Sequence, residues 1–328
     1  MNRLALILIA LPLAASAAPP ALKEVARIAI PGETRWDYLT VDSAAHRLYV
    51  SHGTATEVID TATNQRIGTI ADTAGVHGIA IASDLGKGFI SDGRDNAITV
   101  FDLKTLKTTA TVRVGTNPDA ILYDPASHLV MTFNGKSEDV TIVDAARGVV
   151  VASVPAGGKP EFAQLGANGQ VWFNVEDTNE LAVLDPKSAK VVRRISLAPC
   201  ESPSGLAVDD RGRFYAVCEN HQMVVVSPEA KVLARASIGA GPDGVAWMDG
   251  AAWSANGQDG TISVVETTSG RFETVATIDS APGARTIAAD LATHRLYLPT
   301  AELQPAKVGE RRAGVPGSFR VLVLENSH

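Results

Sequence analysis

Short apolar runs and turn residues alternate along almost the whole chain. In RLYVSHGTATEVIDTATNQRIGTI, residues 47–70, three apolar runs are separated by turns rich in Gly, Asp, Thr and Asn. Runs of four to six residues with such boundaries are typical of β-strands rather than of helices. Because the arrangement continues to the end of the chain, the pattern predicts an all-β protein.

The pattern repeats about every 40 residues. Seven units open with similar segments, at separations of 40, 42, 42, 43, 39 and 42 residues. The first residues of these segments are Asp37, His77, Asp119, Glu161, Ser204, Asp243 and Arg285. The third run of each unit stops at a side chain that can accept hydrogen bonds from the following turn, such as Asp60, Asp102 or Asp144. A fourth run follows in six units, so each unit is predicted to be a four-stranded antiparallel meander.

The two ends of the chain complete the repeat. The last unit stops after RVLVLENSH and lacks a fourth run, whereas residues 22–30, LKEVARIAI, match that run and precede the first unit. Pairing the N-terminal strand with the last unit closes a ring and leaves no terminal unit with an open edge. The sequence therefore predicts a seven-bladed β-propeller of four-stranded antiparallel blades, forming a single domain over residues 22–328.

The first residues are typical of an export signal. Arg3 precedes an apolar stretch that ends in the small residues Ala15, Ser16 and Ala17, which fits a signal peptide over residues 1–17, with cleavage after Ala17 or Ala18. The alternative, a membrane anchor, needs about 20 apolar residues, and this stretch is shorter. We therefore expect a periplasmic or secreted protein that does not span a membrane.

The charge balance changes the list of partners. The chain has 29 Lys and Arg against 36 Asp and Glu, and no run rich in Lys or Arg. Counterion release, the main source of affinity for nucleic acids, therefore has little to act on. Nucleic acid is an unlikely partner for this chain.

Three segments resemble a known repeat family. RLYVSHG, ITVFDLKTLKTTATVRVGTNPDAILYDP and SIGAGPDGVAW are similar to the repeats of YVTN propellers, in particular the YncE-like periplasmic proteins. The likeness covers the whole chain after the signal peptide. The resemblance implies a propeller of the WD40 and YVTN kind that acts as a scaffold, and it says little about activity.

Two sets of residues should meet at one end of the central channel, which we call the mouth. Loops that lead into the innermost strands share this end with loops that leave the second strands. The seven first residues, Asp37 to Arg285, form what we call the mouth ring, and the second strands end at His52, Asp92, Asn134, Val175, Cys218, Asn256 and Thr300. Four carboxylates with only Arg285 against them predict a negative mouth that favours a cation, a metal ion or an amine.

The residues expected to bind a ligand at the mouth are Trp36, Asp37, Asp92, Asp119, Glu161, Asp243 and Arg285. A plainer interpretation stays open for Asp119, Glu161 and Asp243, which follow a proline. In this interpretation their carboxylates accept backbone hydrogen bonds in the turn before the strand, as short acidic side chains often do.

Two histidines are candidates for a metal site. His52 ends the second strand of the first blade and His77 opens the next blade, so the sequence places two imidazoles at one edge of the mouth. With Asp37 or Asp92 they would suit Zn²⁺ or Cu²⁺, or His77 would act as a general base oriented by a carboxylate. Isolated histidines are more often ordinary surface groups.

The chain has two cysteines, Cys200 and Cys218, both on the mouth side of the fifth blade. In an exported protein the simplest expectation is a disulfide, with a metal site formed by Cys and His as the alternative. A C-x-x-C-H motif and an adjacent Cys pair are absent, and so are phosphate-binding and glycine-rich nucleotide motifs. We expect no haem and no nucleotide cofactor.

The last unit carries an insertion of about 17 to 20 residues at about 301–318. Its Lys307, Arg311 and Arg312 stand among Pro and Gly, a composition that suits an irregular flap over the mouth. A basic flap over an acidic mouth would close as a lid or bind a zwitterionic or anionic ligand. An inserted surface loop without function is the alternative.

Two functions remain open. The first is a monomeric, non-catalytic scaffold that binds a small molecule, a metal ion or a protein partner at the mouth. The second is a metal-dependent propeller enzyme, a hydrolase or lyase that uses His77 with nearby carboxylates. Fold analogy alone supports the enzyme, and the sequence shows no nucleophile motif.

Overall fold

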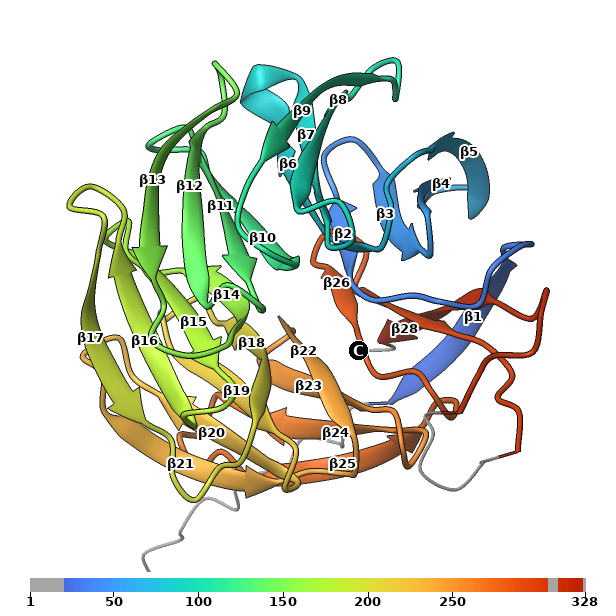
Figure 1. The fold of residues 1–328 in the computed structure, drawn as a ribbon. Coiled ribbons are helices and arrows are strands. Elements are labelled where there is room, and N and C mark those ends of the chain that lie inside the picture. Colours follow the sequence, from blue (N-terminus) through green and yellow to red (C-terminus); the bar gives the residue numbers. More distant parts are fainter. Residues whose placement is uncertain (1–20, 306–311, 327–328) are drawn as a thin grey trace, which may run out of the picture.

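The computed structural model describes residues 21–305 and 312–326. These residues form seven four-stranded sheets arranged around a central channel (Figure 1). The predicted seven-bladed β-propeller is confirmed. The predicted signal peptide at 1–17 lies outside the described residues, and no described helix is long and apolar enough to cross a membrane.

Each blade contains four antiparallel strands in chain order, counted outwards from the channel. The first three blades consist of β2 (Leu39–Asp42), β3 (Arg47–His52), β4 (Ala55–Asp60) and β5 (Gln65–Ile70); β6 (Val76–Ala82), β7 (Lys87–Asp92), β8 (Ala97–Asp102) and β9 (Thr108–Arg113); β10 (Pro118–Asp124), β11 (Leu129–Asn134), β12 (Asp139–Asp144) and β13 (Val149–Pro155). A single 3-10 turn, η1 (Ser83–Leu85), joins β6 to β7.

The next three blades follow the same plan. They consist of β14 (Pro160–Leu165), β15 (Val171–Val175), β16 (Glu180–Asp185) and β17 (Lys190–Ser196); β18 (Pro203–Val208), β19 (Phe214–Cys218), β20 (Gln222–Val226) and β21 (Val232–Ser237); β22 (Pro242–Met248), β23 (Ala251–Asn256), β24 (Thr261–Glu266) and β25 (Thr274–Asp279).

The seventh blade joins the two ends of the chain. Its strands are β26 (Ala288–Asp290), β27 (Arg295–Thr300), β28 (Arg320–Asn326) and, on the outside, β1 (Leu22–Ala29). β1 pairs antiparallel with β28 from Leu22 opposite Asn326 to Ala29 opposite Arg320. The N-terminal strand therefore closes the ring in the way the sequence predicted.

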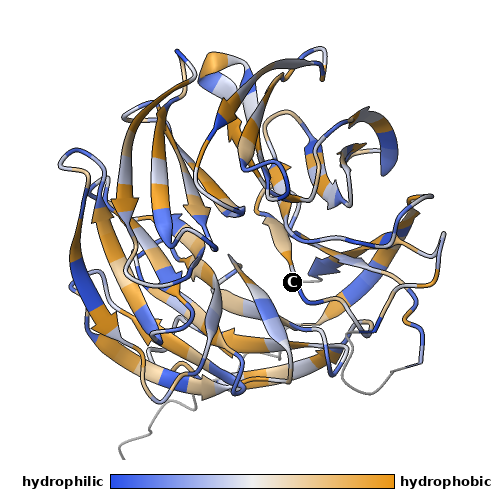
Figure 2. Cartoon of the chain, viewed as in Figure 1, coloured by the Kyte–Doolittle hydropathy of each residue, from blue (hydrophilic) through white to orange (hydrophobic). Residues whose placement is uncertain are grey.

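The core lies between neighbouring blades rather than inside one sheet pair. Figure 2 shows hydrophobic residues along the strands, with hydrophilic residues in many of the loops. Phe133 and Phe173 join the third and fourth blades with ring centres 5.3 Å apart, and Trp172 and Phe214 join the fourth and fifth at 4.3 Å. Burying one such ring contributes about 2 kcal/mol relative to leaving it exposed. Every blade is thus packed on both faces.

The inner strands begin with an irregularity that positions the mouth ring. In blades two to six the pairing between the first and second strands shifts register near the first residues of the inner strand. His77, Asp119, Glu161, Ser204 and Asp243 fall within these shifts. A β-bulge releases a residue from the ladder and redirects its side chain. The same device thus presents a different side chain to the channel end in each of these five blades.

The predicted disulfide is present. Cys200, in the link before β18, is bonded to Cys218 at the end of β19, with the Cα atoms 5.5 Å apart. Both residues are buried. The bond fastens the link to the fifth blade on the mouth side and indicates an oxidising compartment.

Candidate functional site

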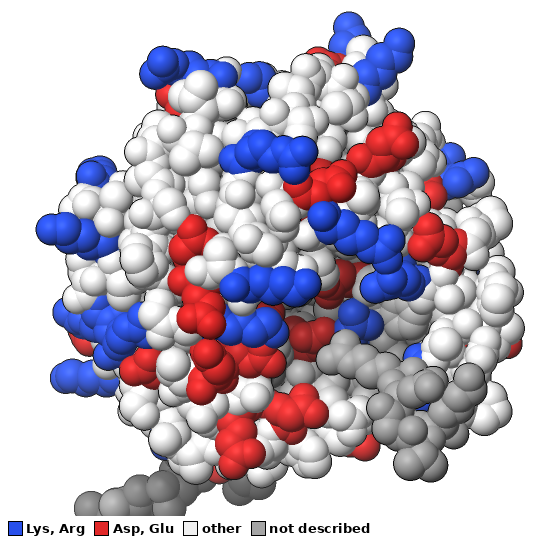
Figure 3. All heavy atoms as spheres, viewed as in Figure 1, with Lys and Arg blue, Asp and Glu red and all other residues white. Residues whose placement is uncertain are grey.

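One cavity of about 750 Å³ occupies the mouth, and all seven residues of the mouth ring line it. Figure 3 shows Asp and Glu side chains in the hollow near the middle of this face, with Lys and Arg side chains around it. The ring of blades brings these residues together, although they are spread over 249 positions of the chain from Asp37 to Arg285. The predicted position of the site is therefore that of a real cavity.

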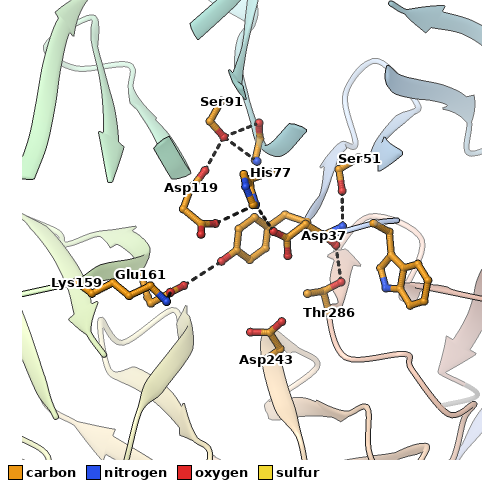
Figure 4. Close-up of polar contacts among 12 residues, drawn as sticks. Asp37, Ser51, His77, Ser91, Asp119, Lys159, Glu161, Asp243 and Thr286 are labelled. Atoms are coloured by element: carbon orange, nitrogen blue, oxygen red, sulfur yellow. Dashed lines mark hydrogen bonds and ion pairs between the residues drawn. The ribbon is translucent and has the colours of Figure 1, made fainter. Parts of the chain in front are cut away.

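His77 lies between two carboxylates from the neighbouring blades (Figure 4). Its Nδ1 donates a hydrogen bond to Oδ2 of Asp37 at 2.5 Å and lies 3.5 Å from Oδ1 of Asp119. The backbone of Asp37 is itself held on both sides. Its N–H donates to the Ser51 hydroxyl at 2.7 Å, and its carbonyl accepts from Thr286 at 2.6 Å.

Oδ1 of Asp119 stands out among the carboxylate oxygens of this cluster. It is buried and has no hydrogen-bond partner among the described residues. Its nearest cation, His77, already directs its Nδ1 proton towards Asp37. Burying an ionised oxygen without a full hydrogen-bond partner is costly, so this atom favours an added donor or cation.

Arg285 covers the opposite side of the ring. Its Nε donates to Asp243 at 2.7 Å, and its Nη2 donates to the carbonyl of Trp36 at 2.8 Å and lies 3.6 Å from Oδ1 of Asp37. The guanidinium also lies over the Trp36 ring, 5.5 Å from the ring centre. Trp36 therefore lines the cavity and helps to hold Arg285.

Glu161 and Tyr38 form the floor of the cavity. Lys159 lies 2.8 Å from Oε1 of Glu161 and also contacts Glu176, and the Tyr38 hydroxyl donates to Oε2 of Glu161 at 3.5 Å. The Tyr38 ring packs edge-on against Phe162. Beyond this ring the channel continues as a separate cavity of about 290 Å³ that is lined by uncharged residues. Tyr38 thus separates a charged mouth from an uncharged part of the channel.

The ionisation of these groups reflects burial and crowding. Burial acts to lower the pKa of His77, but the hydrogen bond to Asp37 and the charge of Asp119 outweigh it and raise the pKa to about 9. Burial raises the pKa of Asp119 and of Glu161, and the nearby carboxylates raise both further. His77 is therefore a cation at neutral pH, and the two carboxyls hold their negative charge weakly.

The contacts of Asp119, Glu161 and Asp243 extend beyond the backbone hydrogen bonds that the plainer interpretation assigns to them. Asp119 lies 3.5 Å from His77 of the preceding blade, and Glu161 accepts from Tyr38 of the first blade besides pairing with Lys159 of its own link. Asp243 contacts Arg285 of the next blade. These side chains connect blades across the mouth, beyond any role in their own turns.

The mouth is less negative than the sequence predicted. Besides His77, the described residues that line the cavity include five carboxylates and five Lys or Arg side chains. The sequence did not place the cations Arg35, Arg94 and Lys159 or the carboxylate Glu176 at the mouth, whereas Arg312 belongs to the predicted basic flap. The other four residues stand in loops next to the aligned positions. There the repeat alignment does not indicate which way a side chain points.

His52 and Asp92 are not among the residues that line the cavity. The His52 ring donates from Nε2 to the Glu33 carbonyl at 2.7 Å, faces Glu57 with Nδ1, and stacks on Phe319. Asp92 is buried in its blade, where Thr99 donates to it at 2.5 Å, and burial raises the pKa of Asp92 to about 7. The structure does not bring these two residues together with His77.

The inserted flap begins and ends at the mouth. Residues 306–311, including Lys307 and Arg311, lie outside the described residues. On either side, Leu303 and Gly314 form an antiparallel bridge, and Arg312 and Gly314 line the cavity. The described residues on either side of the insertion thus lie at the cavity.

Three residues of the mouth ring have the composition of a metal site. One ligand atom from each of Asp37, His77 and Asp119 lies within 4.8 Å of the other two. Three protein ligands with an open position suit a Zn²⁺ ion. His77 must lose its proton to become a ligand, so the raised pKa of His77 opposes a metal ion at neutral pH.

The fold and the mouth cavity define the class of protein, a seven-bladed β-propeller with a charged site at one end of its channel. No protein-family model matches the chain. Protein NirF of Pseudomonas aeruginosa is 28% identical over 141 residues, which are 42% of this chain and 35% of NirF. The matched part thus spans about a third of that relative.

Solved structures agree on the fold. Virginiamycin B lyase from Staphylococcus aureus superimposes with a TM-score of 0.73 at 12% identity, covering 93% of this chain and 99% of the lyase. The WD40 repeats of RRP9 give a TM-score of 0.79 at 10% identity, covering 94% and 99%. At such identities the likeness shows the propeller and carries no information about activity.

Proposed function

We propose that the protein is an exported, non-catalytic propeller that binds a small ligand through a cationic group in the mouth cavity. The observation that carries this proposal is the buried Oδ1 of Asp119, which lacks a hydrogen-bond partner among the described residues and belongs to a side chain that lines a cavity of about 750 Å³. The disulfide between Cys200 and Cys218 supports a periplasmic or secreted location.

The electrostatics of the ring support a cationic group. Burial and mutual repulsion raise the pKa values of Asp119 and Glu161, so both carboxylates gain stability when a positive charge is added nearby. An ammonium group supplies several N–H donors and a charge in one small volume. It therefore supplies both the hydrogen-bond donor and the positive charge that Asp119 lacks.

The protonation of His77 favours binding over base catalysis. A general base must be free of its proton at the working pH, and the pKa of His77 is raised to about 9. At neutral pH its imidazolium is instead a fixed donor to Asp37. The ring is thus built to hold charges in place.

A metal-dependent hydrolase or lyase is the second candidate, because Asp37, His77 and Asp119 can offer three ligand atoms to one ion. In this case the metal would displace the proton of His77, and the affinity for the metal would rise with pH. The metal would supply a Lewis acid, with Arg285 beside it to hold an anionic substrate group.

The test is isothermal titration of the mature protein at pH 7 with butylamine and, separately, with Zn²⁺. We expect butylamine to bind, and Asp119→Asn to weaken the binding about tenfold without lowering the melting temperature. Asp210→Asn, which changes an exposed carboxylate away from the cavity, is the control and should bind as the wild type does. Absence of butylamine binding would overturn the proposal.

Metal content decides between the two candidates. Protein purified from its export compartment without chelator is analysed by mass spectrometry, and its thermal melt is compared with and without EDTA. Near-stoichiometric metal that raises the melting temperature and is lost in His77→Asn would favour the enzyme. Metal-free protein that does not respond to EDTA would favour the ligand-binding propeller.

A further inference from the structure

Arginine side chains surround the outer part of the mouth cavity. Arg35 precedes β2, Arg94 lies in the loop between β7 and β8, and Arg312 lies at the base of the insertion; we call these three the rim cations. All three are exposed and line the cavity. No hydrogen bond or ion pair joins the guanidinium of Arg35 or Arg94 to another residue in the described part of the chain.

The charges of the cavity change sign with depth. In the inner ring four carboxylates face three cations, and the members are Asp37, Asp119, Glu161, Asp243, His77, Lys159 and Arg285. Farther out, Glu176 is the one lining carboxylate among the described residues beside the three rim cations. With every one of these groups in its charged form, the inner ring carries one excess negative charge and the outer part carries two excess positive charges.

From this arrangement we infer that the ligand is dipolar, with an ammonium group at Asp119 and a carboxylate or phosphate group at the rim cations. The inference rests on the proposed function, because it takes the same cationic group at the same carboxylate. It adds the second half of the ligand. A guanidinium binds carboxylate and phosphate oxygens in pairs, which suits Arg35 and Arg94 to this role.

Ligands with a single charge fit the cavity less well. A simple cation must pass the rim cations before it reaches Asp119, and a simple anion gains nothing from the inner ring. A dipolar molecule satisfies both regions at once, because the two attractions act on the same molecule. Because the two groups are linked, the second contact is intramolecular once the first has formed. The affinity of the linked molecule therefore exceeds that of either group alone.

The experiment compares matched small molecules by isothermal titration in low salt. The dipolar probes are glycine, 4-aminobutyrate and 6-aminohexanoate, with β-alanine and phosphoethanolamine to compare carboxylate with phosphate. Butylamine and butyrate are the controls with a single charge. We expect at least one dipolar probe to bind about tenfold more tightly than butylamine, with an optimum chain length.

Variants locate the two ends of the ligand. Arg35→Gln and Arg94→Gln should each weaken binding of the best dipolar probe several-fold without weakening the binding of butylamine. Arg211→Gln is the matched control, because Arg211 is exposed in the loop between β18 and β19 and does not line the cavity. Asp119→Asn should weaken both kinds of probe.

The outcomes separate this inference from the proposed function. If butylamine binds through Asp119 and no dipolar probe binds more tightly, the inference is wrong and the proposed function stands. If butyrate binds as tightly as the dipolar probes, through Arg94, the ligand is a plain anion and the inference is also wrong. If no probe with an amine binds, the proposed function itself fails.

Discussion

At the scale of the residue, the proton on His77 sets the charge of the inner ring. Its hydrogen bond to Asp37 and the charge of Asp119 overcome the effect of burial and raise its pKa to about 9. A histidine whose pKa is raised on folding stabilises the protein fully below its unfolded pKa of about 6.5, and this stability is lost as the pH rises through the folded value. The upper limit of the contribution is about 3 kcal/mol.

We therefore expect His77→Asn to lower the free energy of unfolding most at pH 6, and the difference from the wild type to shrink as the pH approaches 10. Urea denaturation at several pH values measures this. His46→Asn, at an exposed turn position, is the control for removal of a histidine. A difference that stays constant between pH 6 and 10 would show that the pKa of His77 is not raised by its neighbours.

At the scale of the element, the bulge at the start of β6 and the loop after β7 together place the His77 ring. Gly93 follows Asp92 at the end of β7, and a Cβ atom there would lie 2.7 Å from Nε2 of His77. Gly135 follows Asn134 at the same place in the next blade, where the nearest atom to a Cβ would be 3.5 Å away. The two glycines hold equivalent positions in their blades, but the His77 ring faces Gly93 and the more distant Lys159 side chain faces Gly135.

This difference gives a prediction with an internal control. Gly93→Ala should displace the His77 ring, lengthen its hydrogen bond to Asp37 and lower the pKa of His77, whereas Gly135→Ala should leave it unchanged. NMR titration of the His77 ring protons measures the pKa in both variants. Equal titration curves in the two variants would mean that Gly93 does not position the ring.

The same comparison shows what the sequence can predict. Blade boundaries, ring closure and the disulfide follow from strand runs that recur every 40 or so residues, and all three are confirmed. The positions of the rim cations Arg35 and Arg94 were not predicted, because both residues lie in loops outside the aligned positions. The position of His52 at a strand end did not reveal that its ring turns towards Glu33 and Phe319.

At the scale of the whole molecule, the mouth ring depends on the closure of the propeller. Asp37 belongs to the first blade and Arg285 leads into the last, and their side chains meet only because β1 pairs with β28. Ile28 of β1 is buried in the cluster that joins the first and last blades, whereas Val25 of the same strand is 39% exposed. The closing strand therefore has one anchoring position and one free position.

Ile28→Ala should destabilise the whole ring by about 2 to 4 kcal/mol, because it leaves a cavity in that cluster, whereas Val25→Ala should have little effect. If closure couples the blades, calorimetry will show the single unfolding transition of Ile28→Ala moving to lower temperature as one unit. Binding of butylamine at 25 °C should persist in both variants, since neither residue lines the cavity. An early, separate transition confined to the last blade would mean that the seven blades do not unfold together and that the mouth tolerates an open ring.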